Sequence, residues 1–158
     1  PKSLSLGGEK KELSILFSDI RGFTTISESM DPVSLINLLN RYFTPMTNAV
    51  LNHGGMLDKY IGDAVMAFFN APVDVENHAD SACYAALEMI ECLDKLNKEL
   101  EAEGVNAIHI GIGINTADVV VGNMGSDTRF NYTVIGDGVN LASRVEGLTK
   151  NYGVDILI

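Results

Sequence analysis

The spacing of apolar and polar residues along the chain predicts its elements. A short apolar run at 13–18 predicts a first strand, and apolar residues three or four apart from Pro32 to Val50 predict a long helix. Pro45 lies inside that helix, so we expect a kink or the loss of one hydrogen bond there. A glycine-containing stop signal follows at 52–55.

The rest of the chain predicts two hairpins and two more helices. Further segments have the pattern of strands, at 56–61, 64–69, 108–115, 119–124, 132–135 and 154–158. Segments with helical spacing are 78–103 and 137–148. The turn Gly62-Asp63 predicts a hairpin with Asp63 at its tip, and the turn at 116–118 predicts a second hairpin.

This order of elements is typical of a ferredoxin-like α+β fold, an antiparallel sheet with helices on one face. A chain of 158 residues suits one domain with its own core. Residues 1–12 are polar and lack a period, so we interpret them as a linker from an upstream region, with the domain at 13–158. The chain shows neither an apolar run of membrane-spanning length nor a signal peptide.

The charge of the chain narrows its partners. Eleven basic and twenty-one acidic residues give a net charge of −10, which argues against a nucleic-acid or anionic-membrane surface, because both need a basic face. The negative charge does not exclude a small anionic substrate that binds through metal ions. Cys83 and Cys92 lie on opposite sides of one predicted helix, so no disulfide is expected. Unpaired cysteines fit a reducing, cytoplasmic compartment.

Two aspartates follow strands that a ferredoxin-like sheet places side by side. Asp19 ends the first strand and Asp63 lies at the hairpin tip. Two carboxylates a few ångströms apart do not both stay ionised in a dry site without cations. Oxygen ligands without histidine or cysteine suit Mg²⁺ or Mn²⁺, and two such ions ~3.5–4 Å apart suit phosphoryl or nucleotidyl transfer. Two unrelated turn aspartates are the alternative.

Other residues around these aspartates are suited to a phosphate. The turn formed by Gly22, Phe23 and Thr24 opens a helix whose backbone N–H groups can face phosphate oxygens. Asn140 and Arg144 lie one turn apart on a helix, where an amide and a guanidinium form a donor set for a pentavalent phosphorus. The alternative is an exposed asparagine and a surface arginine.

Three motifs together resemble the class III nucleotidyl cyclase catalytic domain, and bacterial adenylyl cyclases most of all. They are 17–24 (FSDIRGFT), 58–63 (DKYIGD) and 132–144 (YTVIGDGVNLASR), and the likeness runs in order from about Glu9 to Ile158. The resemblance implies that Asp19 and Asp63, assisted by the Ile20 carbonyl, bind two Mg²⁺ or Mn²⁺ ions.

The same resemblance assigns the substrate contacts. Asn140 and Arg144 match the pair that orients the ribose and stabilises the transition state at the α-phosphate. Lys59 and Thr133 match the positions that read the purine. A lysine only donates, which suits the acceptor N1 of adenine, whereas the N1–H of guanine requires an acceptor such as a carboxylate. Arg129 is a further candidate phosphate contact, and a solvent-facing loop arginine is the alternative.

The resemblance therefore implies an adenylyl cyclase that converts ATP to 3′,5′-cyclic AMP and pyrophosphate. It also implies a homodimer in which one chain supplies the metal-binding aspartates. The other chain supplies the purine-reading residues together with Asn140 and Arg144. A guanylyl cyclase and a catalytically silent cyclase-fold module are the alternatives. Family members continue beyond the strand at 154–158 with a helix and closing strands, so we expect C-terminal truncation. We also expect an upstream regulatory domain.

Overall fold

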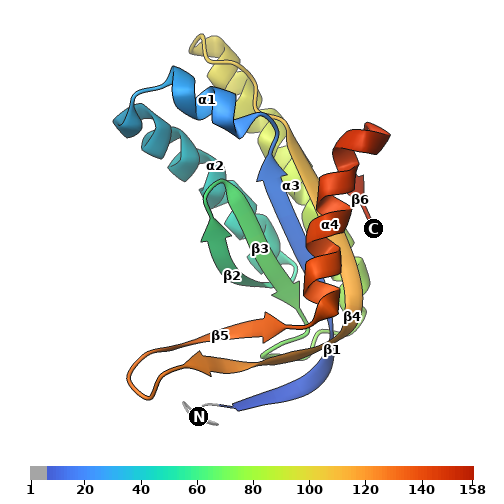
Figure 1. Cartoon of the computed structure of the whole chain (residues 1–158). Helices are drawn as coiled ribbons and strands as arrows, with labels where there is room; N and C mark the ends of the chain where they lie inside the picture. Colours follow the sequence, from blue (N-terminus) through green and yellow to red (C-terminus); the bar gives the residue numbers. More distant parts are fainter. Residues whose placement is uncertain (1–6) are drawn as a thin grey trace.

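The computed structural model describes residues 7–158, which form an α+β fold with a six-stranded sheet (Figure 1). Its elements, in chain order, are β1 (Gly7–Ile20), α1 (Phe23–Ser29), α2 (Pro32–Asn52), β2 (Met56–Ile61), β3 (Ala64–Phe69), α3 (His78–Ala102), β4 (Ile110–Gly125), β5 (Phe130–Ile135), α4 (Asp137–Tyr152) and β6 (Ile156–Leu157). The α+β class is confirmed, and the predicted elements appear in the expected order, except that the strands predicted at 108–115 and 119–124 form one strand, β4. Residues 1–6 of the predicted linker lie outside the described residues. None of the helices in 7–158 is long and apolar enough to cross a bilayer.

The sheet is built around β1. Its strands follow the order β2-β3-β1-β4-β5, all antiparallel, and β6 joins β4 in parallel. β1 pairs with β3 up to Ser18 and with β4 from Gly7 to Ile20. A strand with partners on both edges and covered on both faces buries consecutive side chains, which explains why Leu13, Ile15 and Leu16 are all buried. The buried Ser14 between them is hydrogen-bonded to His78 and Thr116.

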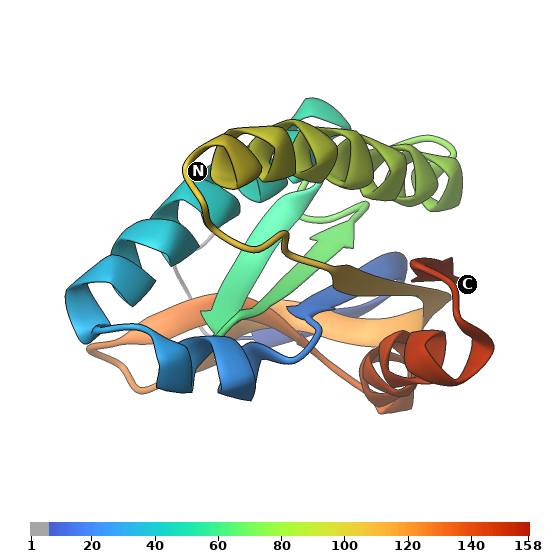
Figure 2. The same ribbon diagram turned by 90° about the horizontal axis from the view of Figure 1, so that it is seen from above.

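Helices cover both faces of the sheet, which differs from the prediction of helices on one face. α2 and α3 pack on one face over a core that includes Leu16, Tyr42 and Ile112. α4 lies on the other face, and its Ala142 joins a second core with Leu13. Figure 2, looking down on the molecule, shows the sheet between these two layers.

The alternation of isoleucine and glycine at the start of β4 explains the position of α4. Ile110, Ile112 and Ile114 belong to the core under α2 and α3. The intervening Gly113 faces α4, and a Cβ atom there would lie 2.2 Å from the backbone nitrogen of Glu146. The missing side chains let the helix backbone lie directly on the strand.

Two predictions, the hairpin within 108–124 and the start of the first strand at Leu13, are wrong for the same reason. β4 is one continuous strand from Ile110 to Gly125, so the predicted hairpin between 108 and 124 does not form; the hairpin lies between β4 and β5. The expected turn at 116–118 instead pairs with β1, which begins at Gly7 rather than at Leu13. Pairing along these polar stretches satisfies their backbone groups and overrides the local turn preference. α2 runs uninterrupted through Pro45.

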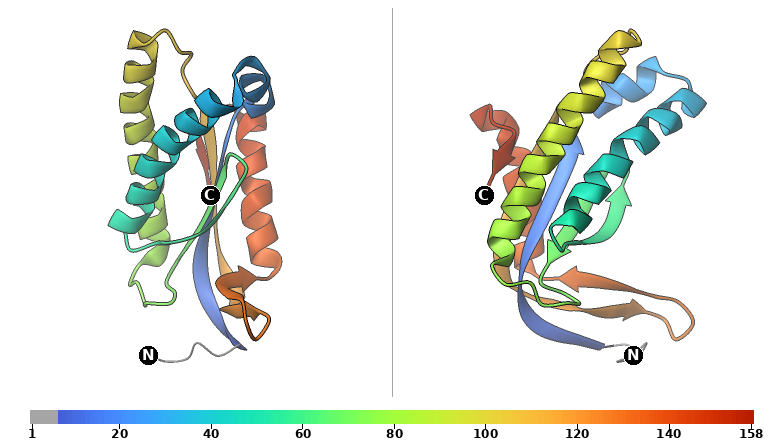
Figure 3. Two further views of the ribbon diagram at one scale, coloured as in Figure 1. Left: turned by 90° about the vertical axis from the view of Figure 1, so that its left-hand side faces the viewer. Right: turned by 180° about the vertical axis from the view of Figure 1, so that it is seen from behind.

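The sheet curls, so that its two edge strands meet. Figures 1 and 3 show β5 running back past the base of the β2–β3 hairpin. The rings of Tyr132 on β5 and Phe68 on β3 lie 6.1 Å apart, and both side chains belong to the second core. Residues far apart in the strand order, such as Asp58 on β2 and Thr133 on β5, are thereby brought into contact.

Candidate active site

The two aspartates predicted as metal ligands lie together at one end of the sheet. β1 and β3 are paired up to Ser18 and Val65, so their adjoining ends place Asp19 beside the β2–β3 turn. Asp63 in that turn accepts a hydrogen bond through Oδ2 from the backbone nitrogen of Ile20, at 2.8 Å. The carboxylate of one turn thus fixes the backbone that follows the other aspartate.

The loop after Asp19 is held by contacts on both sides. Gly22 has φ 67°, a left-handed conformation that favours glycine, and α1 begins directly after it. The backbone nitrogen of Arg21 donates to the His109 carbonyl at 2.8 Å, and its guanidinium donates to the Val154 carbonyl. Phe23 packs its ring against the core, so only its backbone is available to a phosphate.

A third carboxyl group, which sequence reasoning missed, belongs to this site. Glu146 is buried on α4, in line with Ala142 and Thr149. Burial, then a hydrogen bond and charge repulsion from Asp19, raise the pKa of Glu146 to about 8, against the opposing effect of Lys150. The sequence carries one sign of this burial: Glu146 stands on the same side of the predicted helix as Ala142 and Thr149, where apolar or small residues are expected.

The oxygen atoms at this site fit a hard divalent cation. Asp19 Oδ1 and Glu146 Oε2 are buried, and no N–H or hydroxyl group in residues 7–158 donates to either. Burial, then the negative charges of Asp63, Asp19 and Glu146, raise the pKa of the Tyr42 phenol. The described residues contain no group of three or more ligands arranged as a complete metal cage. Mg²⁺ does not need one, because it takes one or two carboxylates together with substrate phosphates.

We expect Glu146 to make the metal-free protein less stable as the pH rises. Its folded-state pKa lies above its ordinary value of 4.5, so its contribution is fully present below that value and is lost towards pH 8. Glu146→Gln carries no such charge and should gain about 2–4 °C in Tm over the parent, on the order of 1 kcal/mol, between pH 5 and pH 8.5. Thermal melts in EDTA measure this difference, with the exposed Glu101→Gln as control. Parallel Tm curves for the parent and Glu146→Gln would contradict the expectation.

The residues predicted to read the purine meet at one carboxylate. Thr133 on β5 donates its hydroxyl hydrogen to Asp58 Oδ2 at 2.6 Å. The other oxygen, Asp58 Oδ1, lies 3.9 Å from Lys59 Nζ, and the Asp58 side chain is only 2% exposed. The structure therefore brings Lys59 and Thr133 together through Asp58, to which sequence reasoning gave no role.

Asn140 and Arg144 point away from the aspartates of their own chain. Both are exposed on α4, on the side opposite to the buried Ala142 and Glu146. Arg129 is exposed at the turn between β4 and β5, where its carbonyl accepts from the backbone nitrogen of Ser126. The roles of these residues and of the Gly22–Thr24 turn stay predictions.

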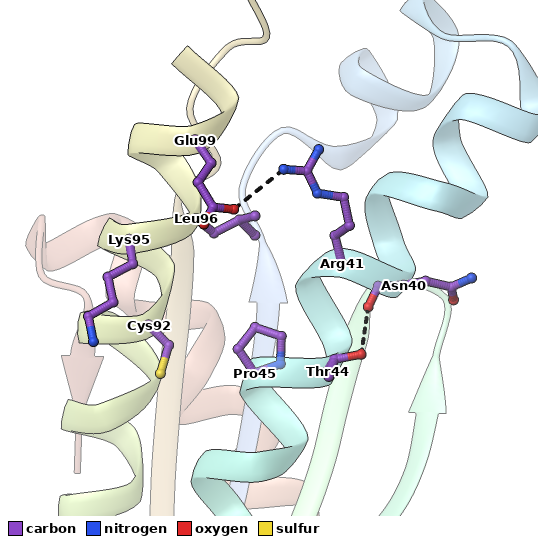
Figure 4. Close-up of a pocket in the computed structure, with 8 residues that line it drawn as sticks. All are labelled: Asn40, Arg41, Thr44, Pro45, Cys92, Lys95, Leu96 and Glu99. Carbon is purple, nitrogen blue, oxygen red and sulfur yellow. Dashed lines mark hydrogen bonds and ion pairs between the residues drawn. The ribbon is translucent and has the colours of Figure 1, made fainter. Parts of the chain in front are cut away.

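A surface hollow of about 570 Å³ between α2 and α3 is separate from this site (Figure 4). It is lined by residues such as Thr44, Pro45 and Cys92, and the ion pair between Arg41 and Glu99, at 3.5 Å, crosses it. None of the predicted site residues lines it.

Comparisons with known proteins place the chain in one family. Residues 8–156 match the adenylate and guanylate cyclase catalytic domain. An adenylate cyclase of Anabaena cylindrica is 46% identical over 152 residues, covering 94% of this chain and 29% of that protein. Adenylate cyclase 1 of Rhizobium meliloti is 40% identical over 148 residues, covering 94% of this chain and 22% of that protein.

Solved structures agree with the sequence comparison. The guanylyl cyclase Cya2 superposes with a TM-score of 0.86 at 39% identity, covering 90% of this chain and 72% of that one. The adenylyl cyclase CyaB from P. aeruginosa superposes with a TM-score of 0.85 at 41% identity, covering 90% and 74%. The chain thus spans less than a third of the two curated relatives, and 72% and 74% of the two solved chains. It belongs to the family of adenylate and guanylate cyclase catalytic domains.

Proposed function

We propose that the chain is the catalytic domain of an adenylyl cyclase, which converts ATP to 3′,5′-cyclic AMP and pyrophosphate. The observation that carries the proposal is the convergence of Asp19 and Asp63, with Asp63 bonded to the Ile20 backbone. The choice of ATP is supported by Lys59 and Thr133, which both contact the carboxylate of Asp58. Relatives that are adenylate cyclases, at 46% and 40% identity, support the same choice.

In this proposal the chain's own groups bind the substrate and stabilise its reacting atoms. Asp19, Asp63 and the Ile20 carbonyl would hold two Mg²⁺ or Mn²⁺ ions, which would acidify the ribose 3′-hydroxyl and neutralise charge on the α-phosphate and the leaving pyrophosphate. The 3′ oxygen releases its proton to solvent water and forms a bond to the α-phosphorus, as the bond from that phosphorus to the pyrophosphate oxygen breaks. The backbone N–H groups of 22–24 face the triphosphate. Arg129 lies at the far end of β4 from Asp19, so its side chain reaches the triphosphate only from the partner chain.

Asn140 and Arg144 act on a substrate held by a second copy of the chain. Because both lie on the outer side of α4, they can reach the aspartates of a partner across a two-fold interface. Leu141 and Ile61 are 43% and 53% exposed, which supports a partner covering these surfaces. Arg144 would stabilise the charge of the pentavalent phosphorus, and Asn140 would orient the ribose.

The short span of the chain relative to its relatives supports a regulatory region elsewhere in the full-length protein.

A guanylyl cyclase is the second candidate, since the guanylyl cyclase Cya2 superposes as well as the adenylyl cyclase CyaB does. To test the proposal, the full-length protein is incubated with ATP or GTP in the presence of MnCl₂ or MgCl₂, and the products are separated by HPLC. We expect cyclic AMP from ATP. Cyclic GMP as the main product would overturn the choice of ATP. The absence of product with either nucleotide would indicate a silent cyclase-fold module.

A further inference from the structure

Asp58 is a buried carboxylate whose position needs an explanation. Its side chain is 2% exposed, although an isolated buried carboxylate costs several kcal/mol. The pairing of β2 with β3 is irregular between Leu57 and Lys59, so Asp58 is the extra residue of a bulge. Bulges re-aim side chains, often beside active sites. Here the bulge lets Asp58 approach both Lys59, its neighbour, and Thr133, on the other edge strand.

The contact with Asp58 decides what the Thr133 hydroxyl can offer to a substrate. A hydroxyl has one hydrogen and two lone pairs, whereas an ionised carboxylate has only lone pairs. The hydrogen therefore points to Asp58 Oδ2, 2.6 Å away. Towards a bound base, Thr133 presents lone pairs alone. Lys59, whose Nζ lies 3.9 Å from Asp58 Oδ1, presents only donors.

This combination matches one purine and not the other. Adenine carries an exocyclic amine, a donor, beside N1, an acceptor, whereas guanine carries O6, an acceptor, beside a donor N1–H. An acceptor at Thr133 beside a donor at Lys59 pairs with the edge of adenine. With guanine, the lone pairs of Thr133 would face the lone pairs of O6. A threonine whose hydroxyl were free to rotate would not discriminate in this way, because it could donate to O6.

We propose that Asp58 is a specificity-determining positioning residue, which fixes the Thr133 hydroxyl as an acceptor and so selects adenine over guanine. This inference rests on the proposed function, because it assumes that Lys59 and Thr133 face the base. Asp58 acts through Thr133 and Lys59 and need not touch the nucleotide. Its role differs from that of a contact that only fastens β5 to β2, and the two roles give different kinetics.

The test is the ratio of kcat/KM for GTP to that for ATP in the full-length enzyme with Mn²⁺. Asp58→Asn keeps the size of the side chain but adds an N–H₂ donor, which frees the hydrogen of Thr133. We expect the ratio to rise about 10–100-fold, the effect of one mismatched hydrogen bond in a buried site. Asp74→Asn is the matched control, since it removes a carboxylate charge paired with Lys11 elsewhere, and it should leave the ratio unchanged.

A double-mutant cycle separates the proposed role from a structural one. Thr133→Val keeps the shape of the side chain and removes the hydroxyl, so Asp58→Asn should no longer change the ratio in that background. A loss of activity that is equal for both nucleotides would overturn the proposal. So would a rise in the ratio of the same size with and without the Thr133 hydroxyl.

Two further results keep the outcome clear. If far-UV circular dichroism shows that Asp58→Asn is unfolded, Asp58→Ala is measured instead, because it removes the acceptor without adding a donor, and the same rise is expected. A parent enzyme that forms no cyclic AMP would refute the proposed function. A parent that prefers ATP, with a variant that keeps the same preference, would refute only the role of Asp58.

Discussion

Asp63→Asn should reduce the formation of cyclic nucleotide by about 10²–10³-fold or more, as expected when a group that stabilises charge at the reacting atoms is lost. Asparagine removes the negative charge that a divalent cation needs. It keeps one oxygen that can accept the hydrogen bond from the Ile20 backbone, now made at 2.8 Å by Asp63. The turn should therefore keep its conformation, and the loss should come from the chemistry of the carboxylate.

The measurement is the initial rate over a titration of MnCl₂, together with far-UV circular dichroism and Tm. Asp118→Asn is the control, because Asp118 is an exposed aspartate in the middle of β4. It should match the parent in both rate and stability. An Asp63→Asn enzyme with unchanged, metal-dependent activity would remove Asp63 from the proposed metal site.

A mixture of two inactive variants should regain activity if the site is shared between chains. Asp63→Asn and Arg144→Ala should each be inactive as homodimers. In a mixed dimer, one site collects both substitutions and the other collects neither. Random pairing of equal amounts makes about half of the dimers mixed, so the mixture should recover roughly a quarter of the parental activity.

A second mixture provides the control for this experiment. Asp19→Asn and Asp63→Asn lie on the same side of the proposed interface, so every site in their mixed dimers keeps one defect and no activity should return. Exchange between chains is followed with two different affinity tags. If exchange is complete and the first mixture stays inactive, each site is built from one chain, and Asn140 and Arg144 lose the roles proposed for them.

Local patterns predicted the parts of the fold that depend on local physics. The periodicity of α2 and α3 and the Gly62-Asp63 turn were found because apolar spacing and turn chemistry lie within a few residues of each other. The meeting of Asp19 with the Asp63 turn followed from the order of strands in a ferredoxin-like sheet.

The missed features depend on contacts between distant segments. Nothing local in 116–118 shows that β1 extends back far enough to pair with it. Glu146 is buried only because Gly113 lets α4 approach the sheet. Asp58 acquires its partner Thr133 through the curl of the sheet and a bulge in β2, and neither of these has a signature in the residues around Asp58.

The unbroken length of β1 gives the domain a mechanical property. One strand connects Gly7 to the loop after Ile20, which we propose binds metal, and β4 is paired to it at every step. Its contour is roughly 43 Å for rises of about 3.3 Å per residue. An extended strand fastened in this way hardly stretches, whereas a loop or a frayed helix would absorb a displacement. A displacement or rotation applied at Gly7 is therefore transmitted along β1 with little loss, and it changes the position of Asp19.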